Sequence, residues 1–176
     1  MERRYGKVNK GYEDEFTPVF FAIESNMMIV HRKHRAANGR RAKEAVMLAL
    51  HRIEAIVTGE EKDLSAFENP ENKLLFNAIM YAIDPLASEK GKERFSQAGG
   101  DEAKLKDLEY LHDMYIVPSR CLMRIAESID MWTKNMGPDG YFNFMEGNMG
   151  SHVSDEMNVC FTLPELNKEQ QKNSHG

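Results

Sequence analysis

Apolar residues recur along this chain at the three- and four-residue spacing of amphipathic helices. The first such stripe follows Thr17-Pro18 and consists of Phe20, Ile23, Met27 and Val30. A stripe of this kind predicts a helix with one buried face. Because threonine can cap a helix and proline suits its first turn, we expect this helix to begin at Thr17-Pro18 and to end near residue 37.

The same spacing predicts a second helix from about Arg40 to Thr58, with Gly59 as its C-terminal stop. Its inward residues are expected to be Ala42, Ala45, Val46, Ala49, Ile53 and Ile56. Residues 65–68 fit a capping box ahead of Asn69-Pro70, which predicts the start of a third helix over residues 70–83. This third helix is apolar nearly all round, so it fits either the centre of a bundle or an oligomer contact.

Two more helices are predicted before the pattern changes. Asp84-Pro85 predicts the start of a short helix that ends before Gly99-Gly100, and Asp101 is placed to cap a long helix after it. We expect Pro118 to kink or split the long helix, because proline removes one backbone hydrogen bond. Gly137-Pro138 predicts its end, and no strand-like alternation occurs before that point.

Residues 137–166 are rich in glycine and asparagine but also contain Tyr141, Phe142 and Phe144. A disordered tail seldom carries such aromatic residues, so an irregular aromatic extension packed on the bundle or on a partner is expected. Thr162 and Glu165 fit a capping box for a short last helix. We therefore predict a single all-α domain: an antiparallel bundle of four to five helices over residues 13–136, this extension, and flexible ends at residues 1–12 and 167–176.

Composition agrees with an ordinary folded domain. The 176 residues are 41% hydrophobic and 29% charged, which is typical of globular proteins. Two cysteines, Cys121 and Cys160, are too few for a disulfide framework, and no signal peptide or membrane span is evident. A cytoplasmic protein with reduced thiols and no membrane partner is expected.

The charge is distributed unevenly along the chain. Residues 1–43 contain ten Lys/Arg and five Asp/Glu, out of 23 and 28 in the whole chain, so the first quarter carries +5 and the remainder −10. Such segregation is typical of a surface that meets an anion, and it also suits two parts of one molecule, or two subunits, that complement each other.

No phosphate-binding loop, dinucleotide-binding motif, nucleophile elbow or paired CxxC motif occurs in the chain. One candidate metal motif remains, since Glu109 and His112 have the Glu-x-x-His spacing of di-iron carboxylate bundles. The spacing places His112 near the core face, where a hydrogen-bonded core histidine is the alternative interpretation. His51 and Glu54 are expected to face solvent, so they do not supply a second motif. A metal-binding protein or metal-dependent bundle enzyme is accordingly the alternative function.

Two other groups of ionisable residues are interpreted as structural. Glu127 and Asp130 lie on the charged side of their helix, so we expect a solvated face there rather than a magnesium site. His31 and His34, with Glu24 two turns earlier, have helical spacing for a metal, but their positive neighbours oppose a cation.

The stretch HRKHRAANGRRAK, residues 31–43, holds six Lys/Arg residues. Arg32, Lys33 and Arg35 lie at the C-terminal end of a helix, where the helix dipole favours cations. By contrast, Arg40, Arg41 and Lys43 open the next helix, where the dipole disfavours them. An anion bound there, at Asn38-Gly39 and the free backbone N–H groups, would offset that cost. The alternative is neutralisation by Glu44, by other nearby acids or by a second subunit.

The leading hypothesis is a non-enzymatic binding or regulatory protein whose basic turn engages an anionic partner, nucleic acid phosphates in the first place. A purely structural assembly subunit is a further alternative, with a homodimer formed through helix 70–83 and the extension at 141–161. No cofactor is predicted. The predicted anion-binding residues are Arg32, Lys33, Arg35, Asn38, Gly39, Arg40, Arg41 and Lys43.

Overall fold

All regular secondary structure among the described residues is helical, and no strand occurs among them. This confirms the all-α prediction. The computed structural model describes residues 10–34, 38–60, 63, 65, 70–84, 86, 89–97 and 99–154, with side chains from Phe16 onward except at 71, 90, 91 and 94. The α-helices are α1 (Lys10–His34), α2 (Gly39–Thr58), α3 (Pro70–Ile83), α4 (Glu89–Gln97), α5 (Leu108–Met136) and α6 (Gly140–Met149). Two short 3₁₀ helices are η2 (Glu102–Lys106) and η3 (Gly150–His152).

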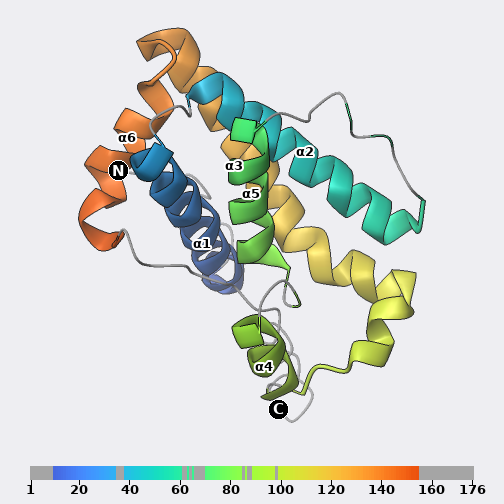
Figure 1. The fold of residues 1–176 in the computed structure, drawn as a ribbon. Coiled ribbons are helices and arrows are strands. Elements are labelled where there is room, and N and C mark those ends of the chain that lie inside the picture. The colour runs from blue at the N-terminus through green and yellow to red at the C-terminus, as the bar shows by residue number, and fades with distance from the viewer. Residues whose placement is uncertain are drawn as a thin grey trace.

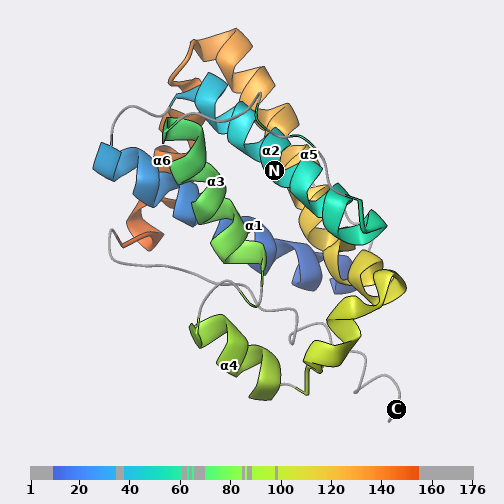
Figure 2. The same cartoon turned by 45° about the vertical axis from the view of Figure 1, so that its right-hand side comes forward.

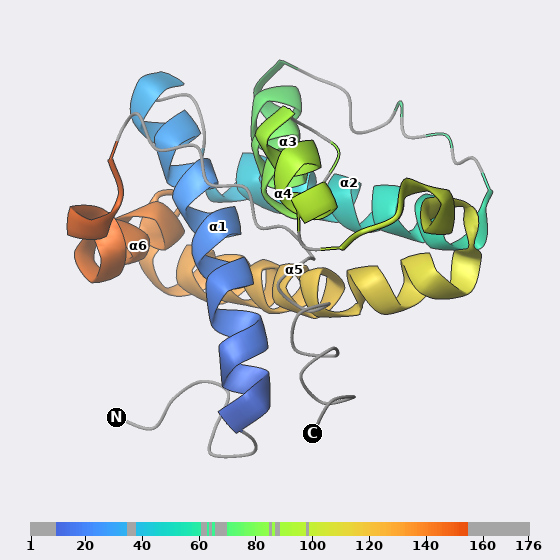
Figure 3. The same ribbon diagram turned by 90° about the horizontal axis from the view of Figure 1, so that it is seen from below.

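Two pairs of packed helices define the architecture. Helices α2 and α5 lie side by side and run in opposite directions (Figure 1). Helices α1 and α3 form a second pair, adjacent in both Figure 1 and Figure 2. This second pair packs across the first, and the view from below shows α1 crossing α5 rather than running along it (Figure 3).

The core lies where the two pairs meet. Its fully covered side chains come from every long helix and include Ile23, Met27, Leu75, Ile79, Leu122, Ile125 and Ile129. Burying such aliphatic side chains contributes about 1.5–3 kcal/mol each before the loss of conformational entropy is subtracted. The described helices do not include one long and apolar enough to span a membrane.

The second helix follows its prediction closely. Asn38 caps α2 by accepting a hydrogen bond from the Arg41 N–H at 3.1 Å. Gly59 ends the helix in the left-handed region at φ 74°. The expected inward residues are buried, except Ile56, which is partly buried against the core. The third helix also begins at Pro70 as predicted, and it buries its apolar face on α1 and α2 while Lys73 and Asn77 are exposed.

Three predicted helix starts are wrong. Helix α1 begins at Lys10, so Pro18 lies inside it. Thr17 and Pro18 are exposed, and water can hydrate the carbonyl that proline leaves without a donor. The Asp84 carboxylate accepts from the N–H of Leu86 at 2.9 Å in a local turn, and α4 begins only at Glu89. Asp101 caps η2 instead of the long helix.

The long helix has its own cap. The Asp107 side chain accepts a hydrogen bond from the Glu109 N–H at 3.0 Å, which starts α5 at Leu108. Helix α5 then continues through Pro118 without being split and ends at Gly137, whose φ is 86°. The predicted stop at Gly137-Pro138 is therefore confirmed.

The extension after Gly137 is more regular than predicted. Residues 140–149 form α6, so the expectation of irregular structure is wrong for this part. Tyr141, Phe142 and Met145 are at most 1% exposed, which confirms that the extension packs on the bundle. Residues 155–176, with Cys160 and the predicted capping box at 162–165, lie outside the described residues, as do residues 1–9, Glu68 and Asn69.

Candidate anion-binding junction

The predicted anion-binding residues lie where the C-terminal end of α1 meets the N-terminal end of α2. The C-terminal end of α5 and helix α6 lie beside this junction (Figure 1). The last turn of α1 contains four basic residues, His31 to His34, and the first turn of α2 contains no acidic residue. Arg35 lies outside the described residues.

Arg32 is held by the chain's own oxygen atoms. Its Nε donates to the Glu146 carboxylate at 2.6 Å, and its terminal nitrogens donate to the carbonyls of Val153 at 2.6 Å and Gly150 at 2.9 Å. The side chain is only 18% exposed. These contacts tie the end of α1 to α6 and η3, so Arg32 has a structural role.

His31 makes a second tie between the same elements. Its ring stacks on that of Phe142, with centroids 4.1 Å apart and an angle of 1° between the planes. Stacked rings at this distance add to the burial energy of the aromatic side chains. Together with Arg32, this contact fixes the angle at which α6 lies on α1.

The backbone at the start of α2 is already engaged. Gly39 donates its N–H to the Pro138 carbonyl at 2.8 Å, and the Asn38 side chain serves as the helix cap. Because Gly39 is buried against α5, a Cβ at this position would lie 2.5 Å from Thr133 Oγ1 and 3.1 Å from the Pro138 carbonyl oxygen. The Gly39 N–H is therefore used in packing α2 on the end of α5, and the Arg41 N–H is used by the Asn38 cap.

Two of the three cations that open α2 are neutralised within the chain. Arg41 lies 3.2 Å from the Glu44 carboxylate, and Lys43 donates to Asp130 of α5 at 2.5 Å. Both pairs are solvent-accessible, with side-chain exposures of 31%/31% and 37%/60%. Solvent-accessible pairs of this kind contribute about 0–1 kcal/mol each. Replacing the carboxylate partner of Arg41 or Lys43 by another anion therefore costs little free energy.

Lys33 and Arg40 differ from these residues. Both are exposed, and neither forms an ion pair within the part of the chain that the structure describes. They come from the two helix ends that meet here and are joined by only a short connection. Among the predicted anion-binding residues that the structure describes, these two offer charge to a partner directly.

The predicted metal motif lies elsewhere, and the prediction that His112 is near the core face is wrong. The His112 side chain is 66% exposed, and its Nδ1 lies 3.8 Å from the Asp113 carboxylate. Glu109 is exposed as well. The helical wheel misplaced His112 because α5 buries Leu111, Met114 and Tyr115, and His112 falls just outside that arc.

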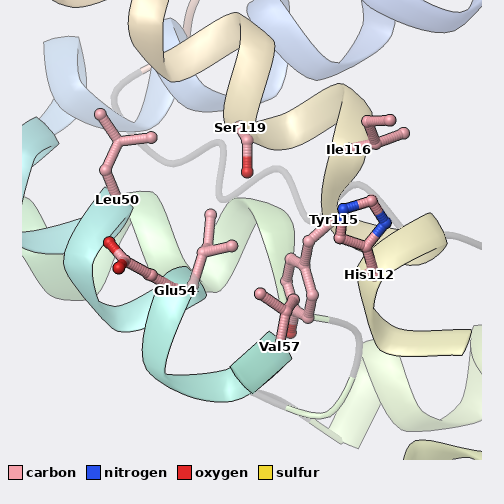
Figure 4. A pocket seen from close by; sticks show the side chains of 8 residues that line it. Leu50, Glu54, Val57, His112, Tyr115, Ile116 and Ser119 are labelled. Carbon is pink, nitrogen blue, oxygen red and sulfur yellow. The ribbon is translucent and has the colours of Figure 1, made fainter. Parts of the chain in front are cut away.

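A pocket of about 230 Å³ lies between α2 and α5 and has His112 and Glu54 in its lining (Figure 4). Its wall is mainly apolar, from Leu50, Ile53, Val57 and Ile116, and Ser119 points toward it from α5. No cluster of three or more His, Cys, Asp or Glu side chains suited to a metal occurs among the described residues. Glu127 and Asp130 are exposed, as the interpretation of a solvated face requires.

Sequence reasoning missed one buried polar contact. The Tyr141 hydroxyl donates to the Glu24 carboxylate at 2.7 Å, and both residues are buried. Glu24 lies four positions after Phe20 and three before Met27, so the helical stripe already placed it on the core face. Tyr141 is completely covered, and the hydrogen bond gives each of these two buried polar groups a partner.

No protein-family model matches the chain, and comparison with curated proteins and with solved structures gives no significant match. The function is accordingly inferred from the residues of the junction alone.

Proposed function

We propose that this protein is a non-enzymatic binding protein that engages an anionic partner, the phosphates of nucleic acid, through the cations of the α1–α2 junction. The observation that carries the proposal is the exposure of Lys33 and Arg40 at adjoining helix ends, without an ion pair among the described residues. Arg40 also stands at the positive end of the α2 dipole, where an anion would relieve an unfavourable charge.

The junction supports recognition by side chains rather than by backbone N–H groups. Because Gly39 donates to Pro138 and Asn38 caps the helix, a phosphate would be met by Lys33 and Arg40. Arg41 and Lys43 would join them by exchanging Glu44 and Asp130 for phosphate oxygens, at small cost. Contacts of this type position a protein on a nucleic acid backbone without reading its sequence.

The binding that these contacts support is weak and depends on salt. Four cations that displace counterions from a duplex give a slope of about −3 to −4 in the logarithm of affinity against the logarithm of salt concentration. The net charge of −5 opposes approach of a polyanion at long range. We therefore expect binding at about 50 mM salt and its loss toward about 200 mM.

Fluorescence anisotropy with a mixed-sequence duplex and a single strand of equal length tests the proposal. The variant Lys33→Glu/Arg40→Glu is expected to lose binding at low salt. A matched control, Lys104→Glu/Lys106→Glu in η2, makes the same change in net charge at exposed positions away from the junction and should reduce affinity only slightly. Equal binding by the wild type and the junction variant, or equal losses in the two variants, contradicts the proposal.

A further inference from the structure

Helix α5 exposes apolar side chains along its outer face. Ile116, Met123 and Met131 are 38%, 56% and 49% exposed. They are spaced by seven and eight residues, so they lie along one side of the helix. Most large hydrophobic side chains that the described residues expose belong to α5. The opposite side of the helix is packed in the core.

Charged residues of both signs lie between these apolar side chains. Asp113, Arg120, Glu127 and Lys134 follow one another at intervals of seven residues, and all four are exposed. Residues seven apart lie on the same face of a helix, two turns from each other. Arg124 is also exposed on this face, between Arg120 and Glu127. From Asp113 to Lys134 the outer face of α5 therefore carries the charge sequence minus, plus, plus, minus, plus.

This pattern is complementary to itself in one orientation. If a second α5 lies antiparallel, with a two-fold axis between Met123 and Arg124, Asp113 faces Lys134 of the other copy and Arg120 faces Glu127. The two Arg124 side chains lie beside the axis, and each is about one turn from Glu127 of either copy, which offsets their mutual repulsion. Each pair occurs twice, because a two-fold interface repeats every contact. In a parallel arrangement each charge would meet its own sign, which is unfavourable.

The same register joins the apolar positions. Ile116 falls opposite Met131 of the second copy, and Met123 lies at the axis. Ile116 also lines the 230 Å³ pocket between α2 and α5, so this pocket lies at the edge of the face. Methionine is flexible and fills irregular apolar gaps, which suits Met131 of the second copy to the rim of that pocket.

We propose that two copies of this chain associate through the outer faces of α5 in this antiparallel register. The face differs from the one predicted from the sequence, since α6 buries Tyr141, Phe142 and Met145 within its own chain. A contact limited to one helix from each subunit buries much less surface than the standard interface of about 1,600 Å². The dimer is therefore expected to be weak and to depend on protein concentration. The proposal is independent of nucleic acid binding.

Sedimentation equilibrium over a range of protein concentrations, in low salt, tests the association. The wild type should show a monomer–dimer equilibrium with a dissociation constant in the micromolar range or weaker. Arg120→Glu and Glu127→Arg each place like charges opposite one another and should weaken association about tenfold or more. The double variant Arg120→Glu/Glu127→Arg restores opposite signs and should recover most of it.

Recovery in the double variant is the decisive result, because an effect on folding or on net charge alone does not reverse in this way. Lys106→Glu, an exposed charge reversal off this face, is the control and should leave association unchanged. A wild type that stays monomeric at all concentrations, or a double variant as weak as the single ones, overturns the proposal.

Cross-linking provides a second measurement that does not depend on charge. In a Cys160→Ser background, Met123→Cys places a thiol beside the two-fold axis, and mild oxidation should yield a disulfide-linked dimer. Asn77→Cys, at an exposed position on α3, should give much less. Cys121 is buried and does not compete. Equal cross-linking at the two positions contradicts the proposed register.

Discussion

Arg32 and Lys33 are neighbours in the sequence but have very different surroundings. Arg32 donates to a carboxylate and two carbonyls from residues more than one hundred positions later, whereas Lys33 extends into solvent. Helix geometry explains the difference, because successive residues point about 100° apart. A count of basic residues in the sequence treats the two as equal, whereas in the structure Arg32 is held by its own chain and Lys33 is exposed.

Replacing Arg32 by alanine should therefore destabilise the protein. The Glu146 carboxylate and two carbonyls would lose their donor, and we expect the free energy of unfolding to fall by about 1–3 kcal/mol. Chemical denaturation measures this loss, and faster hydrogen exchange over residues 140–153 should accompany it. Lys33→Ala, the matched control, should change stability by less than about 0.5 kcal/mol. Equal stability of the two variants would show that the contacts of Arg32 with α6 and η3 do not stabilise the fold.

The ion pairs of the junction show what sequence can predict at this scale. Neutralisation of Arg41 by Glu44 was open to prediction, because residues three apart on a helix are neighbours. The partner of Lys43, by contrast, lies 87 positions away in α5, and nothing local identifies Asp130. The same limit applies to the contact of Glu24 with Tyr141. Each residue could be singled out in the sequence, but the hydrogen bond between them could not be predicted.

At the scale of elements, local sequence signals predicted which segments are helical better than they predicted the residues at which the helices begin. The apolar stripes identified every long helix before Gly137. The cap-and-proline signal marked the start of α3 at Pro70 correctly, but capping residues misplaced the starts of α1, α4 and α5. Asp84 and Asp101 accept backbone hydrogen bonds two residues ahead, as they would at a helix start, yet one forms a turn and the other begins a short 3₁₀ helix. Such side chains favour caps and turns alike, so local sequence alone does not separate the two.

The close approach of α2 to α5 depends on Gly39. Its α-hydrogen faces Thr133, so Gly39→Ala should force the two helix ends apart and cost roughly 1–3 kcal/mol. Gly147→Ala is the matched control, since nothing lies within 4 Å of a Cβ there and alanine favours the helix by about 0.5–1 kcal/mol. Urea denaturation of both variants should give changes of opposite sign, and a stabilising Gly39→Ala would exclude tight packing at this position.

The whole molecule shows the limits of pattern reasoning most clearly. Period and composition predicted the all-α class, since an amphipathic stripe reports directly that a helix buries one face. How the helices cross is not encoded in any single stripe, because it depends on which ridges and grooves meet. Helix α6 was missed for a similar reason: two glycines and two asparagines weaken its local signal, and packing of Tyr141, Phe142 and Met145 on the bundle supplies its stability.

Two buried acids make the global stability depend on pH. Burial raises the pKa of the Cys121 thiol far above its usual value, and the charge of Glu24 adds to this. Burial likewise raises the pKa of the Tyr115 hydroxyl, with Asp84 raising it further and Arg52 lowering it. In the unfolded chain the thiol loses its proton at about pH 8.5 and the phenol at about pH 10. The folded chain keeps these protons, so the unfolded state becomes relatively more stable as the pH rises.

The free energy of unfolding should therefore be largest, with respect to these two groups, below about pH 8.5. Above about pH 8.5 the free energy of unfolding should fall by up to about 1.4 kcal/mol per pH unit because of Cys121. Above about pH 10 Tyr115 should add a fall of the same size per pH unit. Urea denaturation between pH 7 and 11 measures the fall. In Cys121→Ala the slope between about pH 8.5 and 10 should be smaller. An unchanged slope would assign the pH dependence to other groups.

The hydrogen bond between Tyr141 and Glu24 spans 117 positions of the chain, and this separation has a consequence for synthesis on the ribosome. At about 5–20 residues per second, roughly 6 to 25 seconds pass between the emergence of the carboxylate and that of its hydroxyl partner. Until then the face of α1 that α6 covers holds a carboxylate that water must continue to solvate. The first helix therefore completes its packing only after nearly the whole described chain has been made.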